Sequence, residues 1–185
     1  MNPALKFKPL TEIMRINGVP VYAHWSLVVV WAVILILALR RPGQMLAVWT
    51  GYSLLILLHE CGHMIAAQGK GCRVTSIELY PIHGFTRFGL PWSRYDHAVI
   101  AWGGVAAQAV VAAPLIAYAE VFGFPRSALA GTAIGILGYY SVLLAMFNLI
   151  PVAPLDGATA WHLFPELLKR LRKQPVKRKA GWRGW

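Results

Sequence analysis

The sequence is short of charged residues, and of acidic residues above all. Only 14% of its 185 residues are charged, and Asp and Glu number 7 against 18 Lys and Arg. With 57% hydrophobic residues and 8 Trp, this balance excludes an ordinary soluble domain and indicates an integral membrane protein. Two cysteines, Cys61 and Cys72, make no disulfide framework, and we expect free thiols. No cleavable signal peptide is evident, because the first apolar run is long enough to remain as an anchor.

Long apolar runs predict an α-helical membrane protein with about four transmembrane helices. Each run is long enough, at about 1.5 Å per residue, to cross a hydrocarbon core of about 30 Å. The expected helices cover residues 19–39, 45–67, 97–121 and 128–150.

Two further elements are expected outside these runs. A short β-hairpin at the membrane surface is predicted at about 73–89, where β-branched and aromatic residues flank the turn Pro81-Ile82-His83-Gly84. A short amphipathic helix is predicted at about 158–171. We therefore expect one membrane-embedded domain at 19–168, with a cytoplasmic juxtamembrane segment at 1–18 and a basic tail at 169–185.

The net charge of +11 is compatible with binding either to nucleic acid or to anionic lipid headgroups, and the location of the charges decides between them. Placing residues 1–18, the loop at 68–97 and the tail on one side of the membrane gathers 15 of the 18 Lys and Arg there. By the positive-inside rule, both termini are expected in the cytoplasm, with the protein in the cell membrane. An RNA-binding tail is the alternative, but its position just past a membrane helix favours anionic lipid headgroups over nucleic acid.

The chemistry-bearing residues stand inside the second apolar run. His59 and His63 are one helical turn apart, so they project from the same face, where two imidazoles can hold one metal ion beside Glu60. This is the H-E-x-x-H zinc signature. The alternative is a pair of ordinary hydrogen-bonded helix histidines, but ionisable groups within a membrane helix are costly. Cys61 points away from this face and is expected to be a small packing residue.

The scarcity of acidic residues narrows the search for a third ligand. Two histidines need another protein ligand, and a catalytic zinc leaves a fourth position for water. Four of the seven acidic residues belong to surface segments, one lies at the far end of the third helix, and Glu60 is within the motif, which leaves Asp156. Pro151 and Pro154 break the preceding helix, so the chain can turn back toward the histidines. The alternative is that Asp156 caps the following helix.

These two motifs resemble those of the site-2 protease family of intramembrane zinc metalloproteases. The family pairs H-E-x-x-H with a later N-x-x-P-x-x-P-x-D-G pattern, which this chain matches at Asn148, Pro151, Pro154, Asp156 and Gly157. The segment 18–26 also resembles the start of the family's first helix, and residues 72–90 resemble its membrane-associated strands. The third helix departs from the pattern, since Gly103-Gly104 and then Gln108 stand where the family often has Gly-Pro and then Asn. The role of Gln108 is therefore left open.

The resemblance implies hydrolysis of peptide bonds within or near the transmembrane segment of membrane-protein substrates. Such activity serves regulated intramembrane proteolysis or the clearance of signal-peptide remnants. One catalytic Zn²⁺ would be held by His59, His63 and Asp156, with Glu60 as the general base. Asn148 would hydrogen-bond the substrate backbone or the oxyanion, or else join two helices. From the sequence we expect no PDZ or CBS domain of the kind that larger members of the family carry.

Three points beyond the zinc site stay open at this stage. His24 is expected to pack near an interface rather than to line the access route. The edge of the 73–89 hairpin is expected to hold an unwound substrate strand by β-addition. The other functions to consider are a membrane metallohydrolase acting on a lipid-linked substrate and a catalytically silent membrane binding module.

Overall fold

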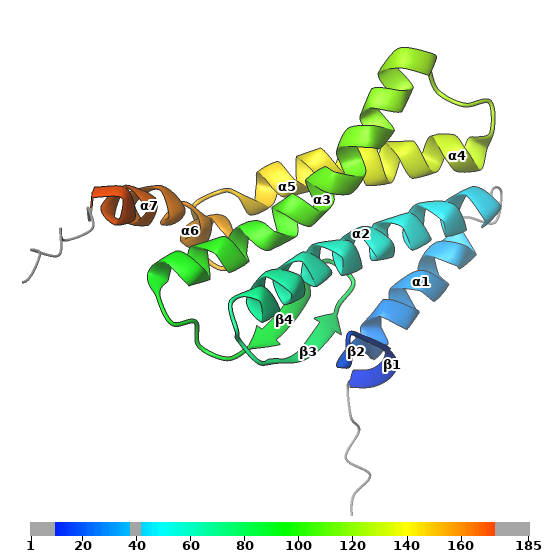
Figure 1. Cartoon of the computed structure of the whole chain (residues 1–185). Coiled ribbons are helices and arrows are strands. Elements are labelled where there is room, and N and C mark those ends of the chain that lie inside the picture. Colours follow the sequence, from blue (N-terminus) through cyan, green and yellow to red (C-terminus); the bar gives the residue numbers. More distant parts are fainter. Residues whose placement is uncertain (1–9, 38–41, 173–185) are drawn as a thin grey trace, which may run out of the picture.

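The computed structural model describes residues 10–37 and 42–172, which are mostly helical and carry one small sheet (Figure 1). Three helical segments in this part of the chain are long and apolar enough to cross a membrane. They are α2 (Pro42–Gly69), α3 (Arg94–Phe122) and the continuous run Ala128–Asn148. The predicted helices at 45–67 and 97–121 are thus confirmed, each with slightly wider bounds.

The predicted first helix at 19–39 is wrong over its first six residues. The strand β2 (Val19–His24) precedes a shorter helix, α1 (Trp25–Leu37). Val19 and Val21 are buried, and residue 20 between them is less so, which is the two-residue period of a strand. The thirteen described residues of α1 extend about 20 Å, less than the hydrocarbon core. Residues 38 and 39 of the predicted helix lie outside the described part.

The sheet has four strands in the order β1-β2-β3-β4. β1 (Leu10–Ile16) pairs antiparallel with β2, which runs parallel to β3 (Val74–Leu79), and β4 (Gly84–Phe88) closes the sheet antiparallel to β3. The predicted hairpin at 73–89 is confirmed as β3 and β4. β1 lies in the segment expected to be juxtamembrane, and residues 1–9 of that segment lie outside the described part.

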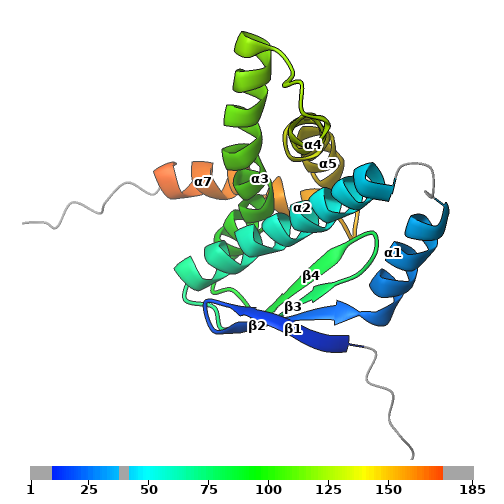
Figure 2. The same cartoon turned by 90° about the vertical axis from the view of Figure 1, so that its right-hand side faces the viewer.

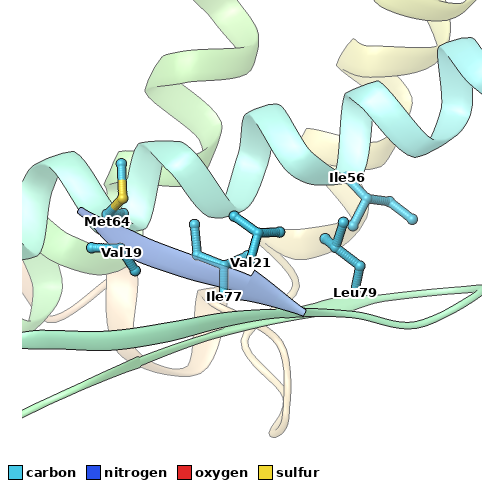
Figure 3. Packing of buried hydrophobic residues seen from close by; sticks show 6 residues of the cluster. All are labelled: Val19, Val21, Ile56, Met64, Ile77 and Leu79. Atoms are coloured by element: carbon cyan, nitrogen blue, oxygen red, sulfur yellow. The ribbon is translucent and has the colours of Figure 1, made fainter. Parts of the chain in front are cut away.

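The sheet packs beneath α2 (Figure 2). A cluster of buried apolar side chains joins α2 to the two central strands (Figure 3), and its members are Val19, Val21, Ile56, Met64, Ile77 and Leu79. Each is at most 6% exposed. Burial of this cluster fixes the rotation of α2 about its axis, because its sheet-facing residues cannot turn away without exposing apolar surface.

On its other side, α2 crosses α3 with the two backbones in direct contact. A Cβ atom added at Gly103 would lie 2.5 Å from the carbonyl oxygen of Gly62, and one added at Gly62 would collide with the carbonyl of Gly103. The two glycines therefore allow the helices to approach this closely.

The last helices differ in detail from the predictions. The segment predicted at 128–150 is helical to Asn148, as α4 (Ala128–Ala133), the π-helical turn η1 (Ile134–Tyr140) and α5 (Ser141–Asn148). The amphipathic helix predicted at 158–171 is divided into α6 (Gly157–Ala160) and α7 (Leu163–Arg172). Residues 173–185 of the predicted basic tail lie outside the described residues.

Candidate metal centre and active site

His59 and His63 share one face of α2, as the spacing predicts. Both are buried, and their Nε2 atoms are 3.0 Å apart. The face they occupy is the one that α3 covers. A Cβ atom at Gly104 of α3 would lie 2.5 Å from Cε1 of His59, so glycine makes room for the imidazole.

Asp156, which directly precedes α6, lies next to the two histidines. Its Oδ2 atom lies 2.9 Å from His59 Nε2 and 3.2 Å from His63 Nε2. Two imidazole nitrogens and one carboxylate oxygen form a donor set that zinc takes, and ligand atoms about 2.0–2.1 Å from a tetrahedral zinc lie about 3.3 Å apart. The three residues, with ligand atoms all within 4.8 Å of one another, therefore fit a single metal ion.

The loop between α5 and α6 positions the Asp156 carboxylate. After α5 the chain turns, and Trp161 Nε1 donates a hydrogen bond to the carbonyl of Leu149 at 2.7 Å, which ties the two ends of the loop together. Trp102 of α3 donates to the carbonyl of Ala160 at 3.0 Å. Asp156 does stand at the start of α6, but its side chain makes no capping hydrogen bond, so the capping alternative is wrong.

The carboxyl of Asp156 is influenced by both histidines. Burial raises its pKa, but hydrogen bonds from His59 and His63 lower it by more, so the net pKa lies below the ordinary value. The group is therefore held as a carboxylate, the form that binds a cation.

Each histidine is oriented by a hydrogen bond on its other nitrogen. His59 Nδ1 donates to Gln108 Oε1 at 3.0 Å, and His63 Nδ1 donates to the carbonyl of Ile100 at 2.8 Å. With Nδ1 holding its proton in this hydrogen bond, Nε2 is the nitrogen that would give up its proton and bind a metal ion there. Gln108 is 1% exposed. The sequence left its role open, because its contact with His59 depends on how α3 packs against α2.

Glu60 lies in the same buried region and meets strand β4. Its side chain is 5% exposed, and the hydroxyl of Thr86 is 2.7 Å from its Oε2 atom. The sequence gave no indication of Thr86, because this contact joins residues 26 positions apart on different elements.

A cavity of about 750 Å³ opens onto these groups. His59, Glu60, His63 and Asp156 line it, together with Asn148. The rest of the lining is largely apolar and aromatic, including Phe85, Tyr140, Leu143 and Phe147. Nδ2 of Asn148 is 3.4 Å from His59 Nε2, so this amide faces the site.

His24 packs elsewhere. Its ring stacks on Tyr80 with centroids 5.0 Å apart, and its Nδ1 is 2.6 Å from the hydroxyl of Ser26. These contacts agree with the expected packing role. Cys61 packs against the apolar cluster beneath α2, and both cysteines are free.

Comparisons with known proteins identify relatives along most of the chain. No protein-family model matches. Rip3 of Mycobacterium tuberculosis, whose name describes a zinc metalloprotease, is 32% identical over 158 residues, covering 77% of this chain and 40% of Rip3. Zinc metalloprotease MJ0392 of Methanocaldococcus jannaschii is 26% identical over 155 residues, covering 79% of this chain and 42% of that protein. This chain thus spans less than half the length of either relative.

A solved structure shares the fold. The site-2 protease from Methanocaldococcus jannaschii superposes with a TM-score of 0.67 at 22% sequence identity. The match covers 87% of this chain and 72% of that one. Most of this chain therefore shares its fold with that site-2 protease.

Proposed function

Because this chain belongs to the site-2 protease family, we propose that it is an intramembrane zinc metalloprotease. It hydrolyses peptide bonds within or near the transmembrane segments of membrane-protein substrates. The observation that carries the proposal is the convergence of His59, His63 and Asp156, with ligand atoms within 4.8 Å of one another, next to the buried Glu60. Regulated proteolysis and clearance of signal-peptide remnants are the processes that such cleavage would serve.

Each residue has a stated part in the mechanism. His59, His63 and Asp156 would hold a zinc ion, which would supply acidification of a bound water and polarisation of the substrate carbonyl. Glu60 accepts a proton from the attacking water and delivers it to the leaving amine. Asn148 donates a hydrogen bond to the substrate carbonyl as negative charge develops there.

Substrate access is proposed at the edge of the sheet. A transmembrane helix hides its amides in its own hydrogen bonds, so it must unwind before cleavage. Within the described sheet, β4 pairs on one side with β3, and Gly84, Phe85 and Thr86 of β4 line the cavity. An unwound substrate strand that pairs with β4 would therefore lie along the cavity beside Glu60.

The protein is proposed to be multi-pass in the cell membrane, with both termini cytoplasmic. Lys70 and Arg94 at the ends of α2 and α3 lie on the side where the positive-inside rule places the cytoplasm. We further propose that α1 contributes to a fourth crossing, that residues 19–168 form one metalloprotease domain, and that the tail at 169–185 contacts anionic lipid. α7 supports the last point, since it carries exposed leucines next to three basic residues, Lys169, Arg170 and Arg172.

The proposal is tested with purified protein reconstituted in lipid nanodiscs. One zinc per chain and cleavage of a model transmembrane peptide are expected, and Glu60→Gln should keep the zinc and lose cleavage. Zinc without peptide cleavage would contradict the protease and favour a hydrolase for lipid-linked substrates. Absence of zinc would favour a catalytically silent membrane module.

A further inference from the structure

We infer that Thr86, on strand β4, is a positioning residue for Glu60. The inference rests on the proposed function, in which Glu60 transfers the proton, and it concerns a residue outside both sequence motifs. The Thr86 hydroxyl lies 2.7 Å from Glu60 Oε2 and 3.0 Å from the backbone oxygen of Glu60.

The environment of Glu60 explains why this contact matters. A carboxylate that is 5% exposed has few water partners, and burial without hydrogen bonds is costly. Thr86 has one hydroxyl proton to donate, and both the shorter distance and the negative charge favour the carboxylate oxygen over the backbone oxygen. Thr86 thus holds Oε2 and leaves Oε1 for proton transfer.

Gly84 supports the same arrangement from two residues earlier on β4. A Cβ atom at this position would lie 2.5 Å from Glu60 Cγ and 2.7 Å from Oε1. A side chain there would displace the carboxylate from its place, so glycine lets the strand pass directly against it.

The register of β4 determines which residues meet Glu60. Gly84 and Thr86 are half-buried, whereas Phe85 and Arg87 are exposed, as expected when alternate residues face α2. Thr86 pairs with Ile77 of β3, which is fully buried in the cluster beneath α2. The core therefore fixes the strand that carries Thr86, and a slip by one residue would remove the hydroxyl from the site.

This arrangement links substrate binding to the general base. A substrate strand that pairs with β4 adds to the same element that holds Glu60 in place. Thr86 should accordingly affect turnover more than it affects substrate affinity.

The test compares three variants in nanodiscs, with kcat, KM and zinc content measured for each. Thr86→Val should lower kcat by about 10- to 100-fold with KM within about 2-fold, and Thr86→Ser should restore kcat to within about 3-fold of wild type. Zinc content should equal that of the wild type in both. The matched control is Thr75→Val, because the Thr75 hydroxyl donates to the backbone of Arg87 at 3.1 Å in the same sheet; its kcat should not change.

Several results would overturn the inference. These are a wild-type kcat in Thr86→Val, a Ser variant as slow as the Val variant, and a loss of zinc in proportion to the loss of kcat. If Thr86→Val does not fold, Thr86→Ala set against Thr86→Ser makes the same comparison. Cleavage by the wild type and its loss in Glu60→Gln are measured first, so failure of the proposed function is seen separately, and it overturns the Thr86 role as well.

Discussion

At the scale of single residues, the candidate metal centre depends on groups other than its three proposed ligands. Gln108 accepts the Nδ1 proton of His59, and a backbone carbonyl does so for His63. Such partners set the tautomer and the direction of the imidazole lone pair, and their loss typically costs about 10- to 100-fold in metal affinity.

Gln108→Leu is therefore expected to weaken zinc binding by about 10- to 100-fold, because it removes the acceptor and leaves His59 free to rotate. Gln68→Leu is the matched control, since Gln68 is exposed on α2. Zinc affinity is measured by competition with a chelator of known strength. Equal affinities in the two variants would show that Gln108 does not orient His59.

The residues that the structure brings together at the candidate metal site were accessible from sequence, whereas the residues that support them were not. His59, Glu60 and His63 follow one helical pattern, and Asp156 is the acidic residue that remains once the others are placed, so local spacing and composition were sufficient. Gln108 and Thr86 reach the site from other elements, and their contacts depend on how α3 and β4 pack against α2. No spacing within a single element encodes such contacts.

At the scale of elements, α2 is held from two sides. The sheet packs on one face, through apolar side chains such as Ile56 and Met64, and α3 lies directly against the other. The face of α2 that carries His59 and His63 is thereby fixed between a sheet and a helix.

Gly62→Ala is expected to lower the free energy of unfolding by about 1–3 kcal/mol, because the new Cβ atom meets the backbone of Gly103 and forces the helices apart. Gly69→Ala is the control, as a Cβ atom there has nothing within 4 Å. Unfolding is followed by SDS titration. A Gly62 variant as stable as the control would mean that the helices do not cross with their backbones in contact.

Strand addition is tested by photo-crosslinking. A photoreactive amino acid at Phe85 on β4 should crosslink to a bound transmembrane peptide, whereas the same group at Met14 on β1, at the opposite edge, should not. The two positions match in exposure, at 46% each. Equal crosslinking from both edges, or from Met14 alone, would contradict substrate pairing with β4.

Most helices and the hairpin were predicted from the sequence, but strand β2 was not. The long helices and the hairpin followed from apolar run length and β-branched composition. The segment 19–24 was assigned to a helix because hydropathy does not distinguish a buried strand from a membrane helix. Its pairing with β3, more than 50 residues later, decides the outcome.

At the scale of the whole molecule, the buried His59 and the half-buried Asp156, nearly 100 positions apart, meet at one point. The long apolar helices place that point within a region suited to a membrane, and the loop after α5 returns the chain to it. Of the seven acidic residues in the sequence, two, Glu60 and Asp156, line the same cavity.

Zinc K-edge X-ray absorption on the purified, lipid-reconstituted protein tests the central claim most directly. We predict nitrogen and oxygen ligands at about 2.0–2.2 Å, with scattering from two imidazoles and no sulfur at about 2.3 Å. A sulfur shell would place the metal on cysteine instead. That result, or a sample without zinc, would contradict the convergence of His59, His63 and Asp156 on one ion.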